Sequence, residues 1–330
     1  EARPVETICR GGGTPSLVTS GQLSAFLGRI HERYPVAAGA EITMECNPDD
    51  VEKSYFQAIR DAGINRLSLG TQSFNDQDLE FLGRRHDAAQ NHRALENALA
   101  SGFENISIDL IYGLPGSTQQ SWQASLDKAF AYPIKHLSAY HLTIEPGTPF
   151  ARQKEKGKLR ELDEQSSLER FTTLVDHAGK HGMDQYELSN FALPGYESRH
   201  NSSYWRRQPY LGLGPSAHSY NLRSRHWNIS NLKLYLDSVM DGKPAMEEEV
   251  LELEDHFNEQ VMTGLRTREG IDLNEVARRF GEPYRRYLLD TARTFIDTGR
   301  LVLDGQHLKL SENGMFIADA IMRELIRVED

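Results

Sequence analysis

The sequence is poor in cysteine. Two of its 330 residues are cysteines, Cys9 and Cys46, and two thiols cannot build a disulfide-rich scaffold. Nor can two thiols supply a metal site of three or four thiolates. Both cysteines lie in stretches that are predicted to be strands, so we interpret them as packed thiols. Low cysteine content is typical of reducing compartments, and we expect a cytoplasmic protein.

Long hydrophobic runs and an excess of positive charge are also absent. No run approaches the roughly 18 consecutive apolar residues of a membrane-spanning helix, and no signal peptide is visible. The 48 acidic and 37 basic residues give a formal net charge of -11, which disfavours a broad basic surface for nucleic acid. We therefore expect no membrane segment and no nucleic-acid partner. The first residue is Glu1 and not methionine, and we expect the chain to have been cut at its N-terminal end.

Over the first 190 residues, apolar β-branched runs alternate with helical patterns, which is typical of an α/β fold with a parallel sheet. The expected strands are 5–9, 42–46, 66–70, 106–111, 136–142 and 186–188. Polar or glycine-rich residues end five strands in succession, and in parallel α/β folds the carboxyl ends of strands carry the active site. The pattern predicts a parallel (β/α) barrel of the TIM type over residues 1–190, with one shared site.

Two further regions follow the predicted barrel. Residues 191–244 form a connector rich in glycine and aromatic residues. Residues 245–330 show helical patterns near 250–265, 272–280 and 283–298, then a hairpin over 301–310 and a last helix. This layout predicts a small winged-helix-like domain, a class that commonly binds DNA. Residues 247–330 carry 19 acidic and 11 basic side chains, a net charge of -8, which would repel phosphates.

Several polar features of the predicted barrel are candidate site residues, and each has an ordinary alternative. The triplet 11–13 with Thr14 directly follows a strand, where free amides can approach an anion or zwitterion, although such triplets are also common turns. Glu45 at a strand end is also consistent with a solvated carboxylate, and Arg84 with a charged helix end. Asp109 lies in an otherwise apolar strand, where a carboxylate is costly unless paired or used, so we predict a function for it.

His200 is a candidate ligand in the later part of the chain. It opens the segment HNSSYW, residues 200–205, in which two aromatic rings could stack on a flat macrocycle. A neutral imidazole binds metal ions, although a hydrogen-bonded loop histidine is the ordinary alternative. His218 is a weaker candidate of the same kind.

Six motifs together resemble one family. They are GGGTPS (11–16), Glu45 with NP (47–48), GTQSF (70–74), LGRRH (82–86), DLIYGLPG (109–116) and EPGTP (145–149). In this order they resemble the coproporphyrinogen III dehydrogenase-like branch of the radical S-adenosylmethionine (SAM) enzymes, over essentially the whole chain. The segment HNSSYW resembles the HNxxYW signature of the HemW family of haem chaperones, which the porphyrinogen dehydrogenase proper lacks.

The resemblance implies roles for matching residues. The positions that would bind SAM are Gly12, Gly13, Thr14, Glu45, Gln72, Arg84, Asp109, Ile111 and Ala139, the last two through the backbone beside the adenine. His200 would ligate haem, and Asn201, Tyr204 and Trp205 complete that signature. Residues 245–330 would form the HemN-type C-terminal domain.

The sequence departs from the family at the iron–sulfur cluster. The family uses three cysteines, CxxxCxxC, to hold a [4Fe–4S] cluster, in a segment upstream of the glycine triplet. No such motif is present. We therefore expect a partial barrel that lacks its first strand, and a chain that by itself binds no cluster and does not cleave SAM reductively. The cluster is expected in the full-length protein alone.

Three functions remain open. The first is a haem chaperone that binds haem and inserts it into an acceptor protein, with SAM and a [4Fe–4S] cluster in the full-length protein. The second is an oxygen-independent coproporphyrinogen III oxidase, which would convert a porphyrinogen to protoporphyrinogen IX by radical SAM oxidative decarboxylation. The third is a non-catalytic binding module whose winged helix contacts a protein or nucleic acid, which the negative charge disfavours.

Overall fold

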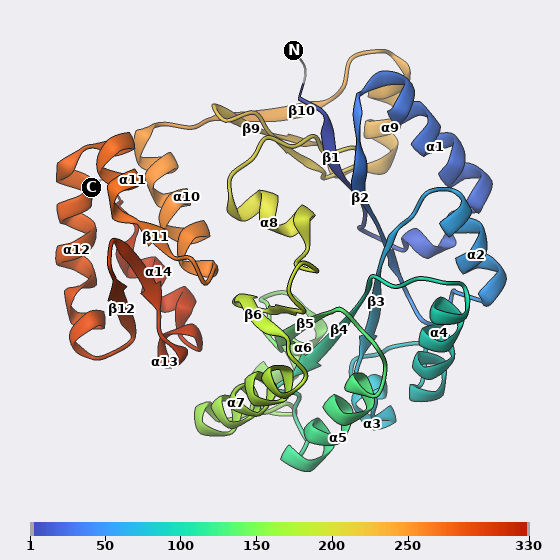
Figure 1. Cartoon of the computed structure of the whole chain (residues 1–330), viewed down its shortest axis with the longest axis horizontal. Coiled ribbons are helices and arrows are strands. Elements are labelled where there is room, and N and C mark those ends of the chain that lie inside the picture. Colours follow the sequence, from blue (N-terminus) through green and yellow to red (C-terminus); the bar gives the residue numbers. More distant parts are fainter. Residues whose placement is uncertain (1–2, 329–330) are drawn as a thin grey trace. The chain divides into compact units, whose positions relative to one another are not determined.

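The computed structural model describes residues 3–328, so the expectation attached to Glu1 lies outside the described residues. The chain divides into two compact units, the first ending at His200 and the second beginning at Asn201 (Figure 1). The division expected from the sequence, at residues 190 and 244, stays a prediction.

A curled seven-stranded sheet forms the first unit. Its strands are β1 (Val5–Arg10), β2 (Val36–Cys46), β3 (Arg66–Gln72), β4 (Ile106–Tyr112), β5 (His136–His141), β6 (Asp184–Glu187) and β7 (Asn190–Ala192). They are hydrogen-bonded in the order β1-β2-β3-β4-β5-β7-β6, with β1 to β5 parallel. The sheet is open at β1 and β6, which confirms the predicted partial parallel barrel.

Helices cover the outer face of this sheet. They are α1 (Ser20–Arg33), α2 (Lys53–Asp61), α3 (Asp76–Phe81), α4 (Ala88–Ala100), α5 (Gln119–Phe130), α6 (Pro149–Glu155) and α7 (Glu164–Lys180), with a 3-10 turn η1 (Pro15–Leu17) before α1. Thr19, Asp87 and Thr118 begin α1, α4 and α5 as capping boxes, which satisfy amides left free at a helix start. Alternate strand residues such as Leu67 and Leu110 are fully buried, and Figure 1 shows α1, α2 and α4 along this side.

The sixth strand differs from the sequence-based expectation. A parallel strand was expected at 186–188, whereas β6 ends at Glu187 and a two-residue turn leads into β7. β7 runs antiparallel to both β5 and β6. β6 therefore runs in the same direction as β5, as expected, but it pairs with β7 and not with β5. The strand β7 was not expected; it forms because a two-residue connection makes a hairpin, whereas a parallel neighbour needs a crossover of a dozen or more residues.

The second unit contains a small sheet and the winged-helix-like domain. The sheet holds β8 (His218–Tyr220), β9 (Ser224–Asn228) and β10 (Met246–Val250), with α9 (Leu232–Met240) between β9 and β10. The domain comprises α10 (Leu253–Arg266), β11 (Ile271–Asp272), α11 (Leu273–Phe280), α12 (Glu282–Asp297), β12 (Leu301–Asp304), β13 (His307–Leu310), α13 (Glu312–Met315) and α14 (Ala318–Leu325). Three helices followed by a hairpin confirm the predicted layout. Across residues 3–328, no helix has both the length and the apolar character needed to span a bilayer.

The inner face of the curled sheet is polar because side chains alternate along each strand. On β2, Ile42, Met44 and Cys46 are buried on the helix side, so Glu41 and Glu45 both face inward. Four residues along one strand separate these two carboxylates, a distance of about 13 Å. The inner face therefore offers polar groups at two levels along the strands, one at Glu41 and one at Glu45.

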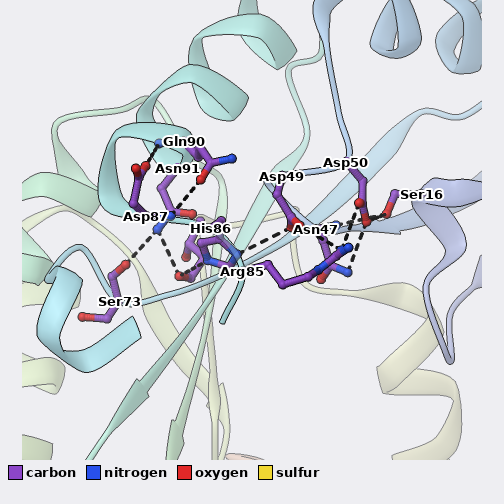
Figure 2. Close-up of polar contacts among 11 residues, drawn as sticks. Ser16, Asn47, Asp49, Asp50, Ser73, Arg85, His86, Asp87, Gln90 and Asn91 are labelled. Carbon is purple, nitrogen blue, oxygen red and sulfur yellow. Dashed lines mark hydrogen bonds and ion pairs between the residues drawn. The ribbon is translucent and has the colours of Figure 1, made fainter. Parts of the chain in front are cut away.

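A strained turn ends β3. Gln72 has φ 63, and the Ser73 amide donates to the Thr71 carbonyl at 2.7 Å, which defines a γ-turn centred on Gln72. The Asn91 amide donates to the carbonyls of Thr71 (3.1 Å) and Ser73 (2.8 Å), and His86 Nε2 lies 3.2 Å from the Thr71 carbonyl (Figure 2). Asn91 and His86 are buried. The buried side chains of Asn91 and His86 thus hold the backbone on both sides of the strained residue in place.

This strain predicts different stabilities for two small substitutions at position 72. Gln72→Gly and Gln72→Ala remove the same side-chain contacts, but only alanine keeps the penalty of a positive φ. We expect the glycine variant to be more stable by about 1 kcal/mol, measured by urea unfolding. An alanine variant as stable as the glycine variant would show that the turn stores no strain.

Candidate functional site

The glycine loop after β1 forms one wall of the candidate site. Gly12 and Gly13 have φ 77 and 66, values that glycine adopts without strain. The Gly12 amide donates to Glu45 Oε2 at 3.3 Å. A Cβ on Gly11 would lie 2.6 Å from Glu45 Oε1, so Gly11 leaves the space that the carboxylate occupies. The carbonyl of Thr14 accepts a bond from the amide of residue 17 at 3.2 Å, which turns the loop into η1.

Glu45 and Asp109 bring two carboxylates to the carboxyl ends of β2 and β4. Desolvation raises the pKa of Glu45, and the Gly12 hydrogen bond partly offsets this. Burial raises the pKa of Asp109 to about 6, and the charge of Glu45 adds to the shift. Hydrogen bonds from Ser138 and from Ser68, whose Oγ lies 3.3 Å from Asp109 Oδ1, oppose it. Asp109 therefore changes protonation close to neutral pH.

Arg84 and Gln72 complete the rim of this site. Burial lowers the pKa of Arg84, and the charges of Asp109 and Asp49 counteract that shift, so the guanidinium is in the electrostatic field of Asp109 and Asp49. The side chain of Gln72 folds back over β3: a Cβ built on Gly70 would lie 3.0 Å from Gln72 Nε2. The glycine at this position thus makes room for the amide of Gln72.

An ion-pair network ties three loops of the rim together. Arg85 bonds Asp49 (2.8 Å) and Asp50 (3.0 Å), and Asp50 accepts a hydrogen bond from Ser16 Oγ at 2.9 Å (Figure 2). These residues come from the loops after β1, β2 and β3. The sequence-based site missed this network, although the strings NPDD and LGRRH carry its charges.

The strands β4 and β5 form the opposite wall. Ile111 pairs with Tyr140 across the parallel ladder, and Ala139 pairs with the residue before Ile111. The Ala139 amide already donates to the Ser189 carbonyl at 2.8 Å. Burial and the nearby charge of Asp109 raise the pKa of Tyr140 to about 12. The ionisation of Tyr140, which was not among the predicted site residues, is thus affected by the charges of both carboxylates of the site.

His200 lies at the other level of the inner face. Its Nδ1 is 2.9 Å from Thr7 Oγ1, and its amide donates to Glu41 Oε1 at 3.0 Å. Burial lowers the pKa of His200, and the charge of Arg66 acts in the same direction, against that of Glu41. The ring is therefore neutral at neutral pH, which is the form that binds metal ions. His200 contacts Glu41, which lies four residues before Glu45 on β2, so His200 and Glu45 are at different positions along the strand.

The other residues of the HNSSYW segment belong to the second unit. Tyr204 contacts Tyr210 edge to face, with ring centroids 4.7 Å apart. The guanidinium of Arg266 covers one face of Trp205 at 4.8 Å, and Asn201 is half-buried. Part of each aromatic surface is thus used in packing, and the haem contacts of Asn201, Tyr204 and Trp205 stay predictions.

Comparison with known proteins identifies the family. Residues 1–129 match the Radical SAM superfamily, and residues 251–317 match the HemN C-terminal domain. The protein named heme chaperone HemW from Lactococcus lactis is 31% identical over 99% of this chain and 86% of its own length. The Mycobacterium tuberculosis protein of that name is 33% identical, over 99% and 82%. The chain belongs to the HemW family of radical SAM proteins.

A solved structure supports the fold of this HemW-family chain. The coproporphyrinogen III oxidase HemN from Escherichia coli, described as a radical SAM enzyme, covers 98% of this chain and 78% of its own, with a TM-score of 0.83. Its sequence identity is 24%. At that identity the likeness establishes the fold and no activity.

The cysteines present do not fit the iron–sulfur cluster that the radical SAM family implies. Cys9 lies on the inner side of β1, where burial and the charge of Glu45 raise its pKa to about 12. Cys46 is buried on the helix side of β2, so the two thiols face opposite sides of the sheet. Within residues 3–328, no three side chains of the His, Cys, Asp or Glu type are arranged to hold a metal ion. No reaction step of this chain is therefore assigned to a cluster.

The raised pKa of Asp109 predicts a pH-dependent gain from Asp109→Asn. The folded state holds the proton more tightly than the unfolded state, so this group's contribution to stability falls as pH rises from about 4 to about 6. The neutral amide removes that penalty. We expect the variant to be more stable by about 2 kcal/mol at pH 7 and equal to the wild type near pH 4, in urea unfolding at both pH values.

The exposed Asp61 provides the control for this measurement. Asp61→Asn in α2 should change stability by less than about 0.5 kcal/mol at either pH. A loss of stability in Asp109→Asn at pH 7 would mean that the ionised carboxylate is stabilised in the fold.

Proposed function

We propose that this protein is a haem chaperone that binds haem through His200. The observation that carries the proposal is that the chain belongs to a family whose members are named heme chaperone HemW, two of which it matches over 86% and 82% of their length. The neutral ring of His200, fixed beside β1 and β2, supports it as the iron ligand. Haem would then pass to an acceptor protein, and we place this activity in the cytoplasm.

We further propose that the mouth of the barrel holds SAM. Backbone amides, two carboxylates and a guanidinium are groups that would suit a zwitterion that also carries hydroxyl groups, and this supports the proposal. The amides of Gly12 and Gly13 and the carboxylate of Glu45 would bind the amino acid end, with Thr14 beside them. Gln72, Asp109 and Arg84 would bind the remaining polar groups, and the backbone at Ile111 and Ala139 would flank the adenine. SAM supplies radical chemistry in this superfamily only with a cluster, so we assign this chain binding alone.

The oxidase alternative rests on the likeness to HemN, which shows a shared fold. Its direct test is anaerobic incubation of SAM and coproporphyrinogen III with the expected full-length protein, reconstituted with its [4Fe–4S] cluster, because this chain alone is expected to bind no cluster. The chaperone proposal predicts that no protoporphyrinogen IX is formed. Its formation would favour the oxidase.

Haem titration of two histidine variants tests the chaperone proposal. His200→Ala should weaken haem binding at least about tenfold and change the Soret spectrum, because iron loses its ligand. His218 is exposed and its ring stacks on Trp227, so His218→Ala should bind haem as the wild type does. Unchanged binding and an unchanged spectrum in His200→Ala would refute the assignment.

A further inference from the structure

One buried carboxylate fixes the start of α8 (Arg199–Trp205), the helix that carries His200. Glu41 Oε2 accepts a hydrogen bond from the Arg199 amide at 3.1 Å, and Glu41 Oε1 accepts one from the His200 amide at 3.0 Å. Glu41 is 7% exposed. The first amides of a helix have no partner within the helix, so this cap ties the start of α8 to β2.

Further contacts hold the same end of the helix. The Arg199 guanidinium donates to the Gly39 carbonyl at 3.0 Å and pairs with Glu6 at 3.7 Å. Arg66, 4% exposed, lies 3.9 Å from Glu41 Oε2, so the cap is itself held by a buried cation. Residues of β1, β2 and β3 thus fix where His200 begins its helix.

The ring of His200 is oriented by a neighbour of the same carboxylate. Thr7 Oγ1 lies 2.9 Å from His200 Nδ1, and Thr7 pairs with Glu41 in the register of β1 and β2. The backbone and the ring of His200 therefore contact adjacent positions of two parallel strands. The position of the His200 backbone and the orientation of its ring are therefore both restrained.

We infer that Thr7 and Glu41 are positioning residues for the haem ligand: Nδ1–H of His200 donates to Thr7 Oγ1, and Nε2 binds iron. The inference rests on the proposed haem-binding function. Histidines that bind metals donate their other ring N–H to an oxygen acceptor, which fixes the tautomer and raises the basicity of the ligand. Thr7 supplies that acceptor, and Glu41 fixes the helix from which the ring projects.

Substitutions at Thr7 test the role of its hydroxyl. Thr7→Val keeps the shape and removes the acceptor, so haem affinity should fall about tenfold. The iron–histidine stretching frequency of the ferrous haem complex, measured by resonance Raman spectroscopy, should fall as well. Thr7→Ser keeps the hydroxyl and should restore both values.

A matched pair of glutamates tests the cap. Glu41→Gln leaves a single acceptor and no charge against the two amides, so haem affinity should fall several-fold, by up to about tenfold. Glu6→Gln changes the exposed partner of Arg199 in the same way and should leave haem affinity unchanged. The melting temperature of each variant is measured without haem.

The outcomes separate this inference from the proposed function. If Thr7→Val matches the wild type in affinity and stretching frequency while His200→Ala loses haem, the positioning role is wrong and the proposed function stands. If His200→Ala binds haem as the wild type does, the ligand assignment itself fails. Equal losses in Thr7→Val and Thr7→Ser, with lowered melting temperatures, would indicate a packing role and overturn the inference.

Discussion

The alternation of side chains along the parallel strands is the constraint on which both proposed sites depend. The outer face of β2 to β5 is covered by helices and is largely apolar, so most polar strand residues face inward. On β2 this rule places Glu41 and Glu45 on one face, about 13 Å apart. Glu45 accepts a hydrogen bond from the glycine loop, and its charge acts on Asp109. Glu41 accepts a hydrogen bond from the His200 amide at the start of α8. One strand would therefore contribute to both proposed sites, at positions four residues apart.

Buried polar groups fix the backbone at both proposed sites. Burying such a group costs free energy of folding unless it is hydrogen-bonded or paired. Asn91 and His86 have no solvent outlet and bond the carbonyls around the strained Gln72. Both carboxylate oxygens of Glu41 accept hydrogen bonds from the amides that begin α8. Fixing these side chains therefore costs strain or desolvation, and Asp109, whose pKa burial raises to about 6, carries a desolvation cost when it is ionised.

The sequence predicted the positions of the strands and the convergence of their carboxyl ends, because periodicity and polar strand ends are local signals. Asp109 was recognised from its apolar surroundings alone. The strand β7 was not predicted, because the two-residue turn after Glu187 carries no strong turn residue. The partners of His200 were not predicted either, since Thr7 and Glu41 lie 193 and 159 residues away along the chain. Contacts at such separations depend on how the sheet curls, which no local pattern encodes.

The most direct test of the two-level account is a crystal structure of the haem-loaded chain, with iron located by its anomalous scattering. The account predicts iron within bonding distance of His200 Nε2, at the level of Thr7 and Glu41, with Nδ1 still bonded to Thr7. Iron bound to Nδ1, to another side chain, or at the level of Glu45 and Asp109 would contradict it.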